Sequence, residues 1–403
     1  MNEKIVIDKT GENRWLVHKF GGSSLADATC FRRVRDLIVG EYADGSARLA
    51  VVVSAMGGMT DALLQLAELA QSDAAAVDGA LLALASRYEE TACVLLDPAP
   101  RRGVLEAWYA DARDIRDLLQ AVQVLGSAPQ RTHDIIAGYG EIWSSRLLTA
   151  LLTQDHSDIA TLWLDARTVI SVSQTRLGPS VQWVESKAHA ASSDSLAGGQ
   201  VVIVTGFIAS DEAGLQTTLG RNGSDHSAAI MAALLGAHAV TIWTDVPGVM
   251  SGDPRRIPEA RVIHQLSYSE AMELAYFGAK VIHPQTMGPA VANDIPIYIR
   301  STFAPELKGT CVSSDAGTDD AIKGITSIGD VAVVNVEGAG MIGVPGTAHR
   351  IFRALRDAEI SVSLISQASS EHSVCLVVHR DRAEDAAAVV SEAFATEIRQ
   401  GQI

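Results

Sequence analysis

The chain has 403 residues, 47% of them hydrophobic, so it is long enough for two or three domains with sizeable cores. Its formal net charge is −16. This balance argues against a nucleic-acid partner, because binding to phosphate backbones requires a surface rich in lysine and arginine.

The cysteines and apolar runs exclude further classes. Cys30, Cys93, Cys311 and Cys375 are far apart and form no CxxC pair, so we expect neither a disulfide framework nor a structural metal site. The longest apolar runs are too short to cross a bilayer, and residues 1–15 lack the apolar core of a secretory signal. We therefore expect a cytoplasmic protein with reduced thiols and no membrane contact.

Short apolar runs alternate with longer helical patterns along the first three quarters of the chain. The runs are continuously apolar, as expected for strands that are covered on both faces. The predicted strands span residues 15–20, 47–55, 160–166, 200–208, 239–246 and 295–302. The predicted helices span residues 27–40, 60–70, 79–96, 102–124, 134–152, 224–235, 267–277 and 284–292. This alternation predicts an α/β fold, an open and mainly parallel sheet with helices on both faces.

A polar segment rich in Gly, Ser and Asp follows at 309–324, and its composition is typical of a linker. The remaining residues predict a small α+β module in the order βαββα. We therefore predict a catalytic domain over 1–312, a linker over 313–330 and a second domain over 331–403.

The first predicted strand ends in a glycine turn. Lys19 and Phe20 are followed by Gly21, Gly22 and Ser23. Glycine lets a ligand approach the backbone, and the free N–H groups at a helix start attract anions. Lys19 adds a positive charge suited to phosphate. An ordinary tight turn is the alternative for one such motif taken alone.

Two more strand exits carry the same pattern. One runs through Gly57 and Gly58 to Thr60, and the other through 218–225. In the latter, Ser224 or Asp225 is suited to cap the helix. Arg221 lies at the positive end of that helix dipole, where a cation is disfavoured unless an anion lies between them.

The three turns indicate one anion site, because ligands of open α/β sheets bind at the carboxyl ends of the strands. The sequence contains no GxxxxGK[ST] motif, so a P-loop NTPase is disfavoured. The polar loop after the strand at 239–246 is long enough to hold a nucleotide, although a surface connection has the same composition.

The motifs together resemble those of aspartate kinases in the amino-acid kinase superfamily. They are KFGGSS at 19–24, GYGEIWS at 138–144, TLGRNGSDHSAA at 218–229, IWTDVPGVMSGDPR at 242–255 and MELAYFGAKVIHP at 272–284. Their order and spacing agree with that family over nearly the whole chain. The carboxyl-terminal part is most similar to the regulatory region of bifunctional aspartokinase–homoserine dehydrogenases, although the chain is too short to include the dehydrogenase.

The resemblance implies the amino-acid kinase fold and transfer of a phosphoryl group from ATP, with Mg²⁺ carried by the nucleotide, to the β-carboxylate of L-aspartate. Lys19 and Asp225 would be catalytic. The implied aspartate-binding residues are Ser23, Thr60, Glu141, Arg221 and Ser224. The implied ATP-binding residues are Lys19, Gly21, Gly22, Thr244, Asp245, Met250, Arg255 and Lys280.

Met250 departs from the family, which often has a tyrosine at this position, and this difference puts the strength of ATP binding in doubt. Two alternatives stay open beside aspartate kinase. One is a kinase for another amino acid, and the other is a catalytically weak amino-acid sensor with the same fold.

The motif GxGxxG at 338–343 follows a predicted strand and taken alone suggests a dinucleotide site. However, the next strand does not end in the acidic residue that such a site requires, and too few residues remain for its sheet. The motif is more similar to the loop of an ACT module. That resemblance implies a threonine or lysine effector and a homodimer or homotetramer formed through ACT modules. The implied effector-binding residues are Gly340, Met341, Ile342, Ile365, Ser366 and Gln367.

Overall fold

The computed structural model describes residues 14–43, 47–175, 178–276, 284–315, 322–367 and 372–403. The chain divides into two compact units, Met1–Thr326 and Ser327–Ile403. The division lies within the segment 313–330 that the sequence suggests as a linker.

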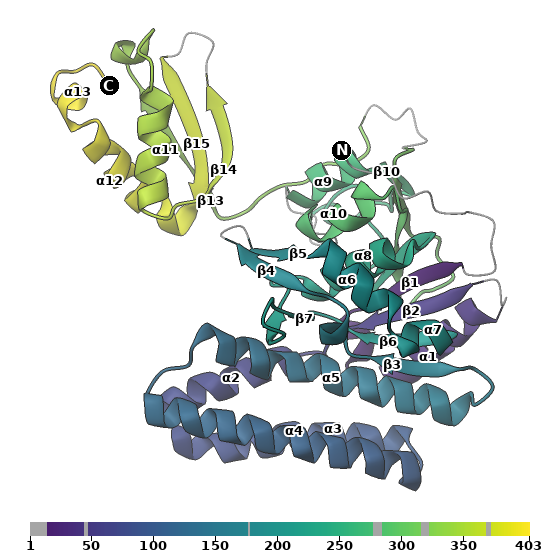
Figure 1. Cartoon of the computed structure of the whole chain (residues 1–403). Helices are drawn as coiled ribbons and strands as arrows, with labels where there is room; N and C mark the ends of the chain where they lie inside the picture. Colours follow the sequence, from purple (N-terminus) through teal and green to yellow (C-terminus); the bar gives the residue numbers. More distant parts are fainter. Residues whose placement is uncertain (1–13, 44–46, 176–177, 277–283, 316–321, 368–371) are drawn as a thin grey trace. The chain divides into compact units, whose positions relative to one another are not determined.

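The first unit is built on an eight-stranded sheet (Figure 1). Its strands are β1 (Trp15–Phe20), β2 (Arg48–Val53), β3 (Thr161–Leu164), β6 (Val201–Thr205), β9 (Ala239–Thr244), β10 (Gln265–Ser267), β11 (Ile297–Ser301) and β12 (Thr310–Ser313). They lie in the order β10-β12-β11-β9-β1-β2-β6-β3, and every pair is parallel except β11 with β12. The predicted mainly parallel α/β sheet is therefore confirmed.

Helices cover both faces of this sheet, as predicted (Figure 1). They are α1 (Ala28–Tyr42), α2 (Met59–Ser72), α3 (Val77–Leu95), α4 (Pro98–Leu125), α5 (Gln130–Asp155), α6 (Trp183–Ala191), α7 (Asp194–Gly198), α8 (Gly223–Leu235), α9 (Tyr268–Tyr276) and α10 (Pro284–Ala292). Alternate residues of β2 show the two cores. Leu49 and Val51 pack with α1 to α5, whereas Ala50 and Val52 pack with α8 and α10.

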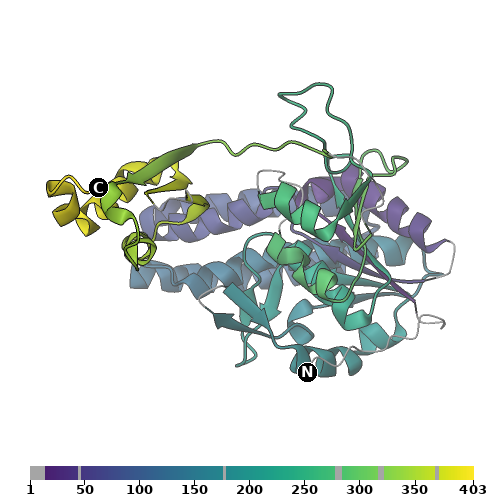
Figure 2. The ribbon, with the colours of Figure 1, turned by 90° about the horizontal axis from the view of Figure 1, so that it is seen from above.

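Two short hairpins extend from the carboxyl side of the sheet. They are β4 (Val172–Thr175) with β5 (Gly178–Val181), and β7 (Ile208–Ser210) with β8 (Gln216–Thr218). The long helices α2 to α5 lie side by side, as Figure 2 also shows. Both α4 and α5 begin four residues earlier than predicted, and Pro98 opens α4 because its missing N–H is not needed there.

The segment predicted as a linker begins later than its composition suggests. Thr310–Ser313 forms β12, which pairs with both β10 and β11. Thr310 and Val312 are fully buried, and Thr310 accepts and donates hydrogen bonds at the edge of the sheet. A four-residue strand with two polar residues carries too little apolar pattern to be recognised from sequence.

The second unit has the predicted order βαββα and is the expected ACT-like α+β module. Its strands are β13 (Val331–Glu337), β14 (Val362–Gln367) and β15 (Ser373–His379), and its helices are α11 (Thr347–Asp357), α12 (Ala383–Ala393) and α13 (Ala395–Arg399). The antiparallel sheet has the order β13-β15-β14, and its core includes Ile351, Leu355 and Leu376. In the described ranges, no helix has both the length and the apolar composition that crossing a membrane requires.

Candidate active site

Two of the glycine turns pack directly against each other at the carboxyl edge of the sheet. Strands β1 and β2 are parallel neighbours, so their ends lie together. A Cβ on Gly22 would lie 3.1 Å from the Ala55 carbonyl oxygen, and one on Gly57 would lie 3.0 Å from the Gly22 carbonyl oxygen. Both distances are shorter than most Cβ contacts in proteins, so glycine at these positions lets the two backbones pack tightly against each other.

The first turn leads to the helix predicted at 27–40, which begins at Ala28. Gly22–Leu25 forms a short 3₁₀ turn, and α1 begins after it. Asp27 caps α1, since its carboxylate accepts a hydrogen bond of 2.9 Å from the Cys30 N–H.

The third turn brings α8 to the same edge. Gly220 and Asn222 adopt left-handed backbone conformations, and Asn222 stands at the cap position of α8. The prediction that Ser224 or Asp225 caps this helix is wrong. The left-handed Asn222 starts the helix two or three residues earlier, so both side chains lie in its first turn.

The three turns enclose a cavity of about 380 Å³. Eight predicted site residues line it: Lys19, Gly21, Gly22, Thr60, Glu141, Arg221, Ser224 and Asp225. Ser23 does not line it. Its side chain is exposed, whereas the neighbouring Ser24 is buried and shares a 2.6 Å hydrogen bond with Thr302.

An ion pair crosses the cavity between two of the turns. Lys19 Nζ lies 2.7 Å from Asp225 Oδ1, and the two side chains are 12% and 16% exposed. The lysine comes from the end of β1 and the aspartate from the first turn of α8. The pair therefore holds a positively charged group in a fixed place beside backbone N–H groups of a helix start, an arrangement suited to phosphate.

Glu141 lies on α5 and is 3% exposed. Burial raises its pKa to about 8, although a hydrogen bond from the Ala55 backbone N–H acts in the opposite direction. Within the described residues, its Oε2 atom has no hydrogen-bond partner. A buried carboxylate oxygen without a hydrogen-bond partner is costly, and a cationic group bound in the cavity would relieve this cost.

Arg221 supplies the opposite charge. Its side chain is exposed and lines the cavity from the turn before α8. Glu141 and Arg221 together give the cavity one group for an ammonium and one for a carboxylate. This combination is suited to the two α substituents of a free amino acid.

Lys19, Gly21 and Gly22 are the predicted nucleotide residues that line this cavity, and the others that the structure describes are not among its lining residues. Thr244 ends β9, which pairs in parallel with β1, and its hydroxyl donates a 3.1 Å hydrogen bond to Asp245. Met250 forms an antiparallel bridge with Val262. Arg255 is exposed and forms a 3.0 Å ion pair with Asp253. Lys280 lies outside the described residues.

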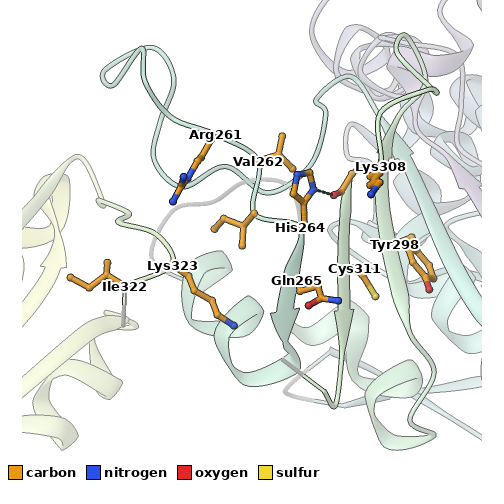
Figure 3. Close-up of a pocket in the computed structure, with 11 residues that line it drawn as sticks. Arg261, Val262, His264, Gln265, Tyr298, Lys308, Cys311, Ile322 and Lys323 are labelled. Carbon is orange, nitrogen blue, oxygen red and sulfur yellow. Dashed lines mark hydrogen bonds between the residues drawn. The ribbon is translucent and has the colours of Figure 1, made fainter. Parts of the chain in front are cut away.

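A larger cavity, about 960 Å³, lies elsewhere, beside strands β10 and β12 (Figure 3). The side chains of His264, Lys308 and Cys311 line it, and His264 Nδ1 lies 3.0 Å from the Gly309 carbonyl oxygen. Among the described residues that line this larger cavity, none is a predicted site residue. The smaller cavity is the better candidate, because charged side chains from separate strand exits converge there.

Sequence reasoning missed part of the cavity wall, notably Phe207 and Asp61. Phe207 has a φ of 66°, which is strained for a residue with a Cβ. The preceding Gly206 gives the local signal. A Cβ there would lie 2.6 Å from Ser224 Oγ and 2.8 Å from the Val53 carbonyl oxygen, so only glycine lets α8 approach β6 and β2.

The predicted effector residues of the second unit fall into two groups. Gly340 donates a 3.0 Å hydrogen bond from its N–H to the Gln402 carbonyl, and Met341 is buried. Ile365, Ser366 and Gln367 lie on β14, an edge strand, with exposed side chains. Ile342 is also exposed.

Comparison with known families matches the two units separately. Residues 14–301 match the amino acid kinase family, and residues 334–394 match an ACT domain. The chain is 40% identical over 395 residues to a bifunctional aspartokinase/homoserine dehydrogenase of Arabidopsis thaliana, covering 96% of this chain and 42% of that protein. The chain thus spans less than half the length of this relative.

Shorter relatives are covered more fully. The chain is 32% identical to lysine-sensitive aspartokinase 3 of Escherichia coli, covering 90% of this chain and 78% of that protein. A crystal structure of E. coli aspartokinase III in complex with aspartate and ADP has a TM-score of 0.75 with 31% identity, covering 91% of this chain and 79% of that one. The chain therefore belongs to the amino acid kinase family and, within it, to the aspartokinases that carry an ACT domain.

Proposed function

We propose that the chain is an aspartate kinase, which transfers the γ-phosphoryl group of ATP to the β-carboxylate of L-aspartate. The observation that carries this proposal is the convergence of Lys19, Asp225, Glu141 and Arg221 on one cavity. The relatives named for aspartokinase activity, and the related structure in complex with aspartate and ADP, support it.

In this proposal Glu141 binds the α-ammonium of aspartate and Arg221 binds its α-carboxylate. The β-carboxylate needs no general base, because it is already ionised and nucleophilic at neutral pH. Lys19 stabilises the charge on the transferring phosphoryl group, and Asp225 holds Lys19 in place. Thr60 and Ser224 line the cavity and would complete the aspartate site, whereas Ser23 does not line it.

The nucleotide would lie along the exits of β1 and β9. Gly21 and Gly22 would let the phosphates approach the backbone, and Thr244, Asp245, Met250, Arg255 and Lys280 would contact ATP. Mg²⁺ would enter with the nucleotide and neutralise part of its phosphate charge.

The test is ADP release measured with aspartate, glutamate or no amino acid. ADP release that occurs with aspartate, but not with glutamate or without an amino acid, supports the proposal. Turnover with another amino acid instead would identify a different kinase of the same family. No turnover with any amino acid, together with tight binding of threonine or lysine, would identify a sensor.

We also propose feedback inhibition through the ACT unit, with threonine or lysine as the effector bound near Gly340, Met341, Ile342, Ile365, Ser366 and Gln367. A related aspartokinase III structure is in complex with lysine and aspartate in its T-state. Leu364 and Ile365 expose apolar surface along the edge strand β14, and a second ACT unit pairing there would cover it. Inhibition curves with each amino acid, and the mass of the protein in solution, test the effector and the homodimer or homotetramer.

A further inference from the structure

Gln216 joins α5, which carries Glu141, to β8, the strand that leads into the turn with Arg221. It lies on β8, and its side-chain Nε2 donates hydrogen bonds of 3.0 Å and 3.1 Å to the backbone carbonyls of Asp134 and Ile135 on α5. Such carbonyls keep a second lone pair after helical bonding, so they can accept these bonds without breaking the helix.

The orientation of the Gln216 amide is fixed from its other end. Arg167 donates a 2.6 Å hydrogen bond from Nη1 to Gln216 Oε1, and the same guanidinium is held by the carboxylate of Asp165. Because Arg167 takes the oxygen, the NH₂ group must face α5. The contact is therefore specific for an amide, which offers an acceptor to one side and donors to the other.

A glycine on α5 makes room for this contact. A Cβ on Gly138 would overlap Gln216 Nε2 and would lie 2.6 Å from Ile208 Cγ2. Gly138 is the first glycine of the GYGE motif, and Glu141 is the last residue of that motif. The conformational cost of a glycine inside a helix is thus offset at the point where the hairpin docks.

Both ends of the contact lead directly to the cavity. On α5, Gly138 lies within one helical turn of Glu141, and a helix transmits a displacement over that distance rigidly. On the other side, Gln216 is five residues before Arg221, and the Leu219 N–H is tied to the Phe207 carbonyl at 2.8 Å. A shift of the hairpin along α5 would therefore change the separation between Glu141 and Arg221.

We propose that Gln216 is a positioning residue that sets the spacing between Glu141 and Arg221, and through it the affinity for the α-amino and α-carboxylate groups of the substrate. The proposal rests on the proposed function, because it assigns those two groups to Glu141 and Arg221. Gln216 itself does not line the cavity of the candidate site.

The test compares Gln216→Leu, Gln216→Glu and Gly138→Ala with the wild-type chain in steady-state assays. Loss of the two donors should raise the aspartate KM roughly tenfold, with kcat and the ATP KM changed by less than about twofold. Gln216→Glu keeps the contact with Arg167 but turns a carboxylate toward the carbonyls, so its aspartate KM should rise at least as much. Arg131→Gln is the matched control, since Arg131 links α5 to the same hairpin through an exposed 2.6 Å ion pair with Asp211, and such pairs contribute little.

Hydrogen exchange separates this proposal from the proposed function. In Gln216→Leu, amides of residues 130–145 and 216–223 should exchange faster together, whether or not the protein is active. If the wild type turns over no amino acid, the proposed function fails. Independently of activity, unchanged hydrogen exchange in Gln216→Leu would show that the Gln216 side chain does not hold the hairpin against α5. In an active enzyme, a lowered melting temperature with an unchanged aspartate KM, or an equal KM effect of Arg131→Gln, overturns the positioning role.

Discussion

Replacing Glu141 by glutamine should stabilise the unliganded protein, and by an amount that depends on pH. Glutamine has nearly the shape of the protonated carboxyl group but never ionises. Burial raises the pKa of Glu141 to about 8, compared with an ordinary value of 4.5. When a group has a higher pKa in the folded protein than in the unfolded chain, its contribution to the free energy of unfolding is full at pH values below the unfolded-state pKa. This contribution is lost as the pH rises from there through the folded-state pKa.

The interval between the two pKa values, at about 1.4 kcal/mol per unit, corresponds to about 5 kcal/mol. The wild type should lose this much of its free energy of unfolding, relative to Glu141→Gln, between pH 4.5 and pH 8. At pH 5.5 the variant should therefore be more stable by about 1 kcal/mol, and at pH 8.5 by about 5 kcal/mol.

Urea denaturation followed by tryptophan fluorescence measures this difference. All six tryptophans lie before residue 244, so the signal reports on the first unit alone. Glu68→Gln on the exposed side of α2 is the control and should give a small, pH-independent difference. Saturating aspartate should reduce the pH dependence of the wild type, because its ammonium would pair with Glu141. If the free energies of unfolding of wild type and Glu141→Gln differ by the same amount at pH 5.5 and pH 8.5, both the buried state of the carboxyl group and its proposed role are refuted.

Three further substitutions test the assigned roles. Lys19→Ala should lower kcat about 10²- to 10³-fold with a much smaller change in the aspartate KM, because the lysine acts on the transition state; an unchanged kcat removes it from the mechanism. Arg221→Ala should mainly raise the aspartate KM, by about 10- to 100-fold for a lost charged contact, and a normal KM contradicts the carboxylate contact. Met250→Tyr should lower the ATP KM by introducing the tyrosine that the family resemblance suggests for this position, while an unchanged ATP KM places residue 250 outside the nucleotide site.

The sequence predicted the central strands because burial on both faces leaves continuous apolar runs such as Ala50–Val53. It also predicted that three glycine-marked strand exits converge, since parallel neighbours end at the same edge. Strands β10 and β12 were missed because a strand of three or four residues shows no readable period. The capping of α8 was assigned wrongly because a left-handed Asn222 and a capping Ser224 are equally compatible with the residue types present.

Glu141 marks a limit of another kind. A glutamate in a helix is usually solvated, and its burial depends on which residues pack over it. The local signal was the glycine on each side of Tyr139, whose function becomes visible only in three dimensions. A Cβ on Gly140 would lie 2.7 Å from Ala55 Cβ, and Gly138 admits Gln216. The periodicity of a sequence reports on a single helix or strand. The need for glycine at positions 138 and 140, however, comes from segments far away in the chain that pack against α5.

The same principle governs the whole cavity. Gly22 against Ala55, Gly57 against Gly22, and Gly206 against Ser224 are contacts in which a Cβ on the glycine would meet a neighbouring strand exit or helix start. Because backbones can meet there, the turns lie close together, and the side chains of Lys19, Glu141, Arg221 and Asp225 reach one cavity. Adding a methyl group at Gly206 would therefore separate α8 from β2 and move Asp225 away from Lys19. Close packing at these glycines thus helps to determine the distance between the charged side chains of the cavity.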